Sequence, residues 1–127
     1  MGDKSVDNPR QKLGKRGERV AEKYLRGKGY EILDRNFRLR AGELDLVAKD
    51  GDTLVFVEVR TTSAIEQGGP LATVTRKKQR RVIRVAMLYL QVKGISDDTC
   101  CRFDVIGLVQ VEDDRLEVEH VIDAFEM

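Results

Sequence analysis

The stretch from Gly42 to Arg60, GELDLVAKDGDTLVFVEVR, constrains the fold more than any other part of the chain. Two β-rich runs, Glu43 to Ala48 and Thr53 to Arg60, flank the dipeptide Asp50-Gly51. Asp-Gly between two such runs is a strong local signal for a β-hairpin. The second run is almost continuously apolar, which predicts a central strand that is buried on both faces.

Hydrophobic spacing predicts the elements around this hairpin. They are helices over 11–28 and 71–92, a strand or irregular extended segment over 30–39, and strands over 102–111 and 115–122. This order of helix, strands, helix and strands predicts an α/β fold with a mixed β-sheet flanked by helices. A length of 127 residues fits one domain. We expect it to span 11–127, after a flexible N-terminal tail over 1–10.

Glu58 does not fit a purely structural interpretation of the second run. It lies among residues that should be core, where an unpaired carboxylate is costly. Because side chains alternate along a strand, Arg60 lies on the same face as Glu58. An ion pair between these two residues is one way to compensate the charge, and a bound cation is the other.

The hairpin register decides where Asp45 lies relative to Glu58. A two-residue turn places Asp45 opposite Phe56, whereas a four-residue loop places it opposite Glu58. Both registers predict one charged face and one apolar face. The charged face carries Glu43, Asp45, Glu58 and Arg60, and the other carries Leu44 and Leu46.

Carboxylates gathered on one face of a sheet repel each other unless something positive lies between them. Oxygen ligands of this kind suit Mg²⁺ or Mn²⁺, and Mg²⁺ typically takes one or two carboxylates and keeps positions for water or a phosphate oxygen. Such a cation could polarise a phosphodiester and lower the pKa of an attacking water. A basic residue beside it could offset the transition-state charge. The pattern therefore indicates a metal site that acts on phosphate esters.

The net charge of +1 conceals a strong segregation of charge along the chain. Residues 1–40 carry 12 basic and 6 acidic side chains, residues 76–84 carry 6 basic and none acidic, and residues 97–127 carry 10 acidic and 2 basic. Local positive fields of this kind favour a nucleic-acid partner, although a solvated helix face is the alternative. The side chains predicted to contact backbone phosphates are Arg38, Arg40, Arg76, Lys77, Lys78 and Arg81.

Other features place the protein in the cytoplasm. No run approaches the ~20 apolar residues that a membrane helix needs, and residues 1–10 contain no stretch typical of a secretory signal. The adjacent Cys100 and Cys101 are expected to be reduced thiols. The single histidine, His120, lacks further ligands at zinc spacing and is interpreted as an ordinary strand residue.

Five short motifs occur in a characteristic order: Gly17-Glu18, Arg35 to Arg38 (RNFR), Gly42 to Ala48 (GELDLVA), Phe56 to Arg60 (FVEVR) and Arg102 to Val105 (RFDV). With them the chain resembles the YraN family of uncharacterised bacterial proteins from Leu13 to the C-terminus. That family is similar in fold to archaeal Holliday junction resolvases and restriction endonucleases. The resemblance therefore implies a restriction endonuclease-like fold of the PD-(D/E)XK type.

The resemblance also implies roles for four residues. Asp45 resembles the first acid of the motif and Glu58 the second. Glu18 resembles the helix carboxylate that often completes the metal shell, and a solvent-facing glutamate paired with a basic side chain is its alternative. Arg60 stands where the motif has lysine. Arginine is always protonated, so it could stabilise charge but could not act as a base.

Three functions are open at this point. The first is a Mg²⁺-dependent nuclease acting on DNA or RNA, with DNA favoured and with structured or branched substrates expected. The second is a nucleic-acid-binding module that has lost cleavage, for which Arg60 is the argument. The third is a protein-interaction domain whose acidic C-terminal third meets a basic partner. A homodimer is expected by analogy with resolvase-like relatives.

Overall fold

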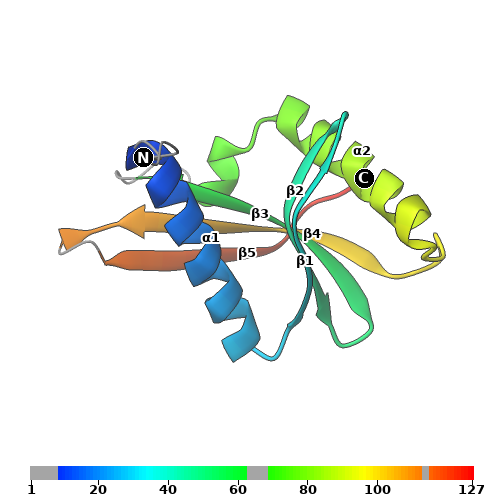
Figure 1. The fold of residues 1–127 in the computed structure, drawn as a ribbon, viewed down its shortest axis with the longest axis horizontal. Coiled ribbons are helices and arrows are strands. Elements are labelled where there is room, and N and C mark those ends of the chain that lie inside the picture. The colour runs from blue at the N-terminus through cyan, green and yellow to red at the C-terminus, as the bar shows by residue number, and fades with distance from the viewer. Residues whose placement is uncertain (1–8, 63–68, 113–114) are drawn as a thin grey trace, which may run out of the picture.

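The computed structural model describes residues 9–62, 69–112 and 115–127. Its elements are α1 (Pro9–Gly27), β1 (Glu31–Leu39), β2 (Gly42–Asp50), β3 (Thr53–Thr62), the 3-10 helix η1 (Pro70–Thr73), α2 (Arg76–Lys93), β4 (Cys101–Gln110) and β5 (Leu116–Phe125). The predicted α/β fold with a mixed sheet and flanking helices is confirmed, in an arrangement consistent with a restriction endonuclease-like fold (Figure 1).

Two predicted boundaries differ from the structure. Helix α1 begins at Pro9, so it includes the last two residues of the predicted tail, whereas residues 1–8 of that tail lie outside the described residues. The predicted helix over 71–92 is two elements, because Val74 is extended and Thr75 starts a new helix. The side chain of Thr75 accepts a hydrogen bond from the backbone N–H of Lys78, which is a standard N-cap.

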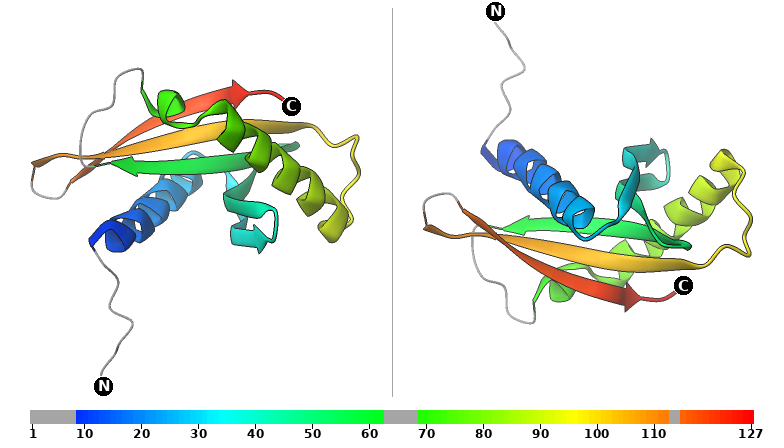
Figure 2. Two further views of the ribbon diagram at one scale, coloured as in Figure 1. Left: turned by 90° about the horizontal axis from the view of Figure 1, so that it is seen from above. Right: turned by 90° about the horizontal axis from the view of Figure 1, so that it is seen from below.

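The sheet has the strand order β1-β2-β3-β4-β5. Neighbouring strands are antiparallel except β3 and β4, which run parallel. A parallel pair needs a crossover connection, and the chain from η1 through α2 supplies it. Helices α1 and α2 pack against opposite faces of the sheet (Figure 2).

Strand β3 is the centre of two cores, as its apolar run predicted. Leu54 and Phe56 belong to the cluster that packs against α2, and Val55 and Val57 belong to the cluster that packs against α1. All four side chains are at most 4% exposed. Burial on both faces fixes β3 in position, and with it the side chains at its C-terminal end.

The prediction that Leu44 and Leu46 share one face is wrong. Leu44 packs in the α2 cluster, whereas Leu46 packs in the α1 cluster. The strand pair β1–β2 changes face here, next to Asn36, which has a positive φ of 50°. The pairing of β2 with β3 ends at Leu46 and Val57, so the tip of the β1–β2 hairpin turns out of the sheet (Figure 2).

A buried polar network joins β4 and β5 on the α1 side of the sheet. Asp104 is fully buried and lies 2.8 Å from Nε2 of His120. It also accepts hydrogen bonds from Arg102 and from the backbone N–H of Asp123, where the register between β4 and β5 shifts. His120 Nδ1 lies 3.2 Å from the hydroxyl of Tyr24. His120 lies in β5, as predicted, and its ring is in addition part of this buried network.

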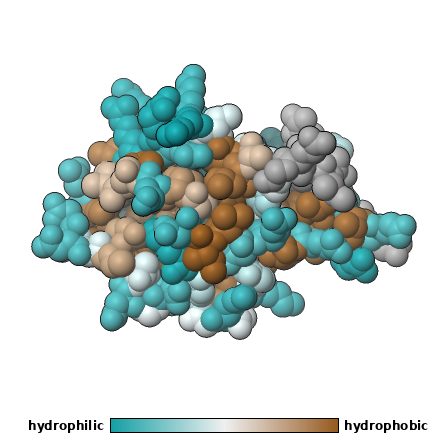
Figure 3. All heavy atoms as spheres, turned by 180° about the vertical axis from the view of Figure 1, so that it is seen from behind, coloured by the Kyte–Doolittle hydropathy of each residue, from teal (hydrophilic) through white to brown (hydrophobic). Residues whose placement is uncertain are grey.

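Large apolar side chains remain exposed at several positions: Leu33, Met87, Val92, Ile122 and Met127. On the face opposite the view of Figure 1, apolar side chains gather near the centre and polar ones surround them (Figure 3). Among the described residues, no helix is long and apolar enough to cross a membrane.

The homodimer stays a prediction.

Candidate functional site

The acidic residues of the hairpin lie where β2 and β3 separate. The pairing runs from Asp50 opposite Thr53 to Leu46 opposite Val57. This is the register that the longer predicted loop gave, although Asp50 and Thr53 are themselves paired and only two residues connect the strands. One step further along, Asp45 and Glu58 follow the last paired residues. The strands therefore deliver two carboxylates to one junction.

Asp45 is held by the backbone of the neighbouring strand. Its Oδ2 accepts a hydrogen bond of 2.8 Å from the backbone N–H of Val59. Burial raises the pKa of Asp45 well above its usual range, and the negative charge of Glu58 raises it further, whereas the bond from Val59 lowers it. The surroundings of Asp45 thus favour its neutral form over the carboxylate.

Glu58 is only 3% exposed and is flanked by two cations. Its Oε2 lies 3.4 Å from Nζ of Lys78 and 3.7 Å from a guanidinium nitrogen of Arg60. The ion pair of Glu58 with Arg60, one of the two ways in which the buried charge could be compensated, is thus present. The closer cation, however, comes from helix α2.

Arg60 is anchored at both ends of its guanidinium. Besides its contact with Glu58, its Nε donates to Oγ1 of Thr73 at 3.2 Å. The Thr73 hydroxyl in turn donates to the carbonyl of Pro70 at 2.6 Å. The short helix η1 therefore holds the side chain that replaces the lysine of the motif.

Lys78 was predicted as a phosphate contact, and sequence reasoning missed its pairing with Glu58. The Thr75 cap fixes the first turn of α2, and the side chain of Lys78 reaches from there to β3. Three cations occupy the start of this helix and its first turn contains no acid. Because cations are unfavourable at a helix N-terminus, this pattern was the available signal that an anion lies nearby.

Glu18 lies beside the acidic group formed by Glu43, Asp45 and Glu58. With its amide oriented to satisfy its neighbours, Asn36 donates to Glu18 and to Glu43 at 3.2 Å each. Burial raises the pKa of Glu18, and the charge of Glu43 raises it further, whereas the bond from Asn36 lowers it. Glu43 also pairs with Arg38 at 3.0 Å. Glu18 is therefore a half-buried neighbour of the acidic group rather than a fully solvated glutamate.

The carboxylates of Asp45 and Glu58 suit a hard cation that is bound by few protein ligands. In the described part of the chain, no three His, Cys, Asp or Glu side chains are gathered as they would be in a preformed metal site. Mg²⁺ needs only one or two carboxylates, since it keeps several waters. Asp45 and Glu58 supply two, and both burial and the charge of Glu58, which raise the pKa of Asp45, are effects that a bound cation would offset. The residues therefore fit Mg²⁺ or Mn²⁺.

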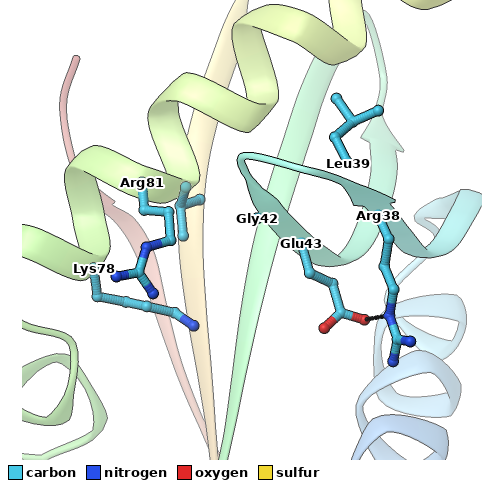
Figure 4. Close-up of a pocket in the computed structure, with 7 residues that line it drawn as sticks. Arg38, Leu39, Gly42, Glu43, Lys78 and Arg81 are labelled. Carbon is cyan, nitrogen blue, oxygen red and sulfur yellow. Dashed lines mark hydrogen bonds and ion pairs between the residues drawn. The ribbon is translucent and has the colours of Figure 1, made fainter.

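The structure brings together three of the six basic residues that were predicted to contact phosphates. Arg38, Lys78 and Arg81 line a cavity of about 300 Å³ between the tip of the β1–β2 hairpin and α2 (Figure 4). The other three, Arg40, Arg76 and Lys77, do not line it. The cavity shares Glu43 with the acidic group and Lys78 with Glu58.

Comparisons with known proteins give a consistent match. The model of the uncharacterised protein family UPF0102 matches residues 17–108. A UPF0102 protein of Chlorobium limicola is 42% identical over 125 residues, which are 94% of this chain and 96% of the relative. A UPF0102 protein of Geobacter sulfurreducens is 47% identical over 115 residues, covering 91% of this chain and 89% of the relative.

One solved structure also resembles the chain, at a lower level. It is SfsA of Pyrococcus furiosus in complex with Ca²⁺, with 13% sequence identity and a TM-score of 0.38. The match covers 92% of this chain and 65% of that one. A TM-score of this size carries no argument about fold or function.

Proposed function

The chain belongs to the uncharacterised protein family UPF0102, and we propose that it is a metal-dependent phosphodiesterase that cleaves nucleic acids. The membership that the sequence motifs implied is thereby confirmed, because the match spans most of the chain. The activity is our proposal, and it is supported by the chemistry of the site.

The observation that carries the proposal is the junction of Asp45 and Glu58. Two carboxylates lie where the strands separate; that of Glu58 is buried, and the surroundings of Asp45 raise its pKa and so disfavour its charged form. Fold stability does not require this arrangement, since like charges in a partly buried site destabilise the folded state. Acidic residues with shifted pKa values that lie beside cations and next to a cavity are typical of functional sites.

Each residue has a role in this proposal. Asp45 and Glu58 would hold Mg²⁺ or Mn²⁺, and Glu18 would support them from α1. When bound, the cation would polarise the scissile phosphate and lower the pKa of a bound water. Val59 keeps the Asp45 carboxylate oriented through its backbone N–H. Arg60 lies close enough to offset negative charge that develops beside Glu58.

Lys78 could take the role of the motif lysine, whose position in β3 is occupied by Arg60. Arg60 cannot accept a proton or lose one at ordinary pH. The ammonium of Lys78 lies closer to Glu58 than the guanidinium of Arg60 does. A lysine is thus present at the site although it comes from α2 instead of β3, and this supports cleavage over a purely binding role.

A second candidate function is a nucleic-acid-binding module that does not cleave. The specific observation in its favour is the tether of Arg60 to Thr73, which gives this side chain a structural role. In that case the acidic centre would bind a cation without hydrolysis. Activity that appears only in Arg60→Lys would identify the chain as this degenerate form.

The remaining features of the proposal follow from the family resemblance and the charge pattern. The substrate is DNA in preference to RNA, and branched DNA in preference to linear duplex. The proposed location is the cytoplasm, where cellular nucleic acid would be available as the substrate.

The test combines Mn²⁺ binding with cleavage. Calorimetry should show binding by the wild type, loss of it in the double variant Asp45→Asn, Glu58→Gln, and retention in Glu31→Gln, an exposed carboxylate on β1. With Mg²⁺, the wild type should cleave a labelled four-way DNA junction and the double variant should not. Mn²⁺ binding without cleavage of junction, duplex or single strand would favour the second candidate, and no Mn²⁺ binding by the wild type would count against the metal-dependent nuclease and leave the non-cleaving module ahead.

A further inference from the structure

The cavity next to the acidic centre has the composition of a phosphate site. It is lined by Arg38, Leu39, Gly42 and Glu43 of the hairpin tip, and by Lys78, Arg81 and Val82 of α2. Three of these side chains are cations and one is an anion. In Figure 4, the charged ends of Lys78 and Arg81 point into the same gap, with Glu43 and Arg38 across it.

Arg81 is the cation of this cavity without a carboxylate partner in the described residues. Glu43 is engaged by Arg38, and Glu58 lies within ion-pair distance of Lys78. The structure records no ion pair or hydrogen bond of the Arg81 side chain within residues 9–62, 69–112 and 115–127. An arginine that faces a cavity and has no carboxylate partner there is suited to receive an anion, because its planar fork matches phosphate oxygens.

The backbone of the hairpin tip keeps Arg81 in this position. Gly42 has a φ of 150°, and a Cβ at this residue would lie 3.1 Å from Cγ of Arg81 and 3.1 Å from Cγ2 of Val85. Glycine therefore lets the stem of Arg81 lie directly against the hairpin. The contact directs the guanidinium along the cavity instead of away from it (Figure 4).

The position of the cavity indicates which phosphate it would receive. Lys78 lines the cavity and also lies 3.4 Å from Glu58. One lysine thus separates the cavity from the acidic centre. A nucleic-acid strand with its scissile phosphate at Asp45 and Glu58 would bring a neighbouring backbone phosphate to Arg81.

We propose that this cavity binds a single backbone phosphate adjacent to the scissile one, with Arg81 as its main ligand and Lys78 shared between the two sites. The position of this phosphate next to the scissile one rests on the proposed function, whereas phosphate binding in the cavity does not. Lys77 and Arg80 of the same helix do not line the cavity and contribute only diffuse attraction to the substrate.

The experiment is a two-dimensional NMR titration of the full chain with thymidine 3′,5′-bisphosphate in metal-free buffer. Saturable shifts are expected at the backbone amides of Gly42 and Glu43 and at the side chains of Lys78 and Arg81. Arg81→Gln should weaken this binding by about tenfold, the loss expected for one charge-assisted contact. Arg80→Gln removes the same charge from an exposed neighbour and should leave the affinity within about twofold.

Two further variants serve as controls, one for the fold and one for the metal site. Arg81→Lys keeps a long stem and the charge, so it should retain more affinity than Arg81→Gln and shows that the fold tolerates substitution. The titration is repeated in Asp45→Asn, which removes the proposed metal ligand and should bind the bisphosphate at least as well as the wild type.

Three results would overturn the proposal. One is equal affinity of Arg81→Gln and Arg80→Gln, and another is a set of shifts spread over α1 and the exposed face of α2. The third is equal perturbation by a hexaglutamate peptide, which would assign the cavity to an acidic protein partner. The Mn²⁺ experiment tests the acidic centre separately, so either hypothesis can fail while the other stands.

Discussion

The carboxylate of Asp45 accepts a hydrogen bond from the backbone N–H of Val59 at the point where backbone pairing between β2 and β3 has ended. A side chain thus satisfies a donor that the next residue of a regular ladder would otherwise engage. This arrangement leaves the β1–β2 tip free to turn toward α2, and it holds an acid beside Glu58. The bend in the hairpin and the acidic site therefore have one structural origin.

We expect Asp45→Asn to stabilise the metal-free protein at neutral pH. The amide oxygen still accepts the bond from Val59, while the repulsion from Glu58 disappears. Thermal unfolding with a chelator present should show a higher Tm for the variant, and Glu31→Gln, an exposed control, should change it little. A lower Tm for Asp45→Asn at neutral pH would instead show that the fold requires this carboxylate.

The gain from Asp45→Asn should depend on pH in a defined direction. The pKa of Asp45 is raised in the folded state, so the native protein binds this proton more tightly than the unfolded chain does. Its contribution is fully favourable below the unfolded value of about 3.9 and is lost as the pH rises through the folded value. The Tm difference between variant and wild type should therefore grow from acid to neutral pH, and a constant difference would contradict the assignment.

Lys78 should matter for cleavage more than its neighbour does. We expect Lys78→Met to reduce kcat by about 100-fold or more, since a positioned cation at a developing charge contributes on that scale. Lys77→Met removes the same charge from an exposed position in the same turn and should change kcat little. Mn²⁺ affinity, measured in parallel, should stay within a few fold in both variants, and equal rates for the two would exclude a special role for Lys78.

Arg60→Lys tests the other cation. If Lys78 supplies the ammonium, the wild type cleaves and Arg60→Lys changes the rate only modestly, because Glu58 keeps a cation on each side. The measurement is single-turnover cleavage of a labelled DNA junction. Cleavage by Arg60→Lys together with an inactive wild type would contradict this expectation.

The sequence could predict the features that depend on local pattern. The Asp-Gly turn, the apolar run of β3 and the placement of Glu58 beside Arg60 all follow from alternation along strands. It could not predict that Leu44 and Leu46 face different cores, because the change of face depends on a bend at Asn36 that a two-residue period does not encode.

Contacts between distant segments were also beyond sequence reasoning. The approach of Lys78 to Glu58 depends on how the crossover helix lies on the sheet, and the pairing of His120 with Asp104 depends on the register of β4 and β5. A single sequence contains no direct signal for either. The unusual density of cations at the start of α2 was a hint whose meaning needed the fold.

Two glycines of α1 should respond oppositely to alanine. A Cβ at Gly14 would meet nothing within 4 Å, so Gly14→Ala should stabilise by about 0.5–1 kcal/mol through helix propensity. A Cβ at Gly17 would collide with Thr61 Oγ1 and lie 3.0 Å from Leu108 Cδ1. Gly17→Ala should therefore destabilise by about 1–3 kcal/mol. Urea unfolding measures both.

The Gly17 result also reports on the site. Because Glu18 follows Gly17, displacing α1 from β3 moves this carboxylate away from the acidic group. We expect Gly17→Ala to weaken Mn²⁺ binding as well as the fold, and Gly14→Ala to leave binding unchanged. Unaltered Mn²⁺ affinity in a folded Gly17→Ala variant would remove Glu18 from the metal shell.

Asp104 should be a main determinant of stability, and its effect should fade in acid. Burial alone would raise the pKa of Asp104, but hydrogen bonds from His120, Arg102 and Asp123 outweigh burial and lower it. Asp104→Asn leaves buried partners without their anion and should destabilise by about 3 kcal/mol or more. Glu117→Gln, an exposed change on β5, should cost little.

The lowered pKa fixes the direction of this pH dependence. The contribution of Asp104 is fully present above its unfolded pKa of about 3.9 and is lost as the pH falls through the lower folded value. The stabilities of wild type and Asp104→Asn in urea unfolding should therefore differ most near neutrality, and the difference should begin to shrink only below about pH 4. A difference that persists unchanged in acid would mean that packing, rather than the charge of Asp104, carries the effect, and the network would then stabilise the fold by its shape alone.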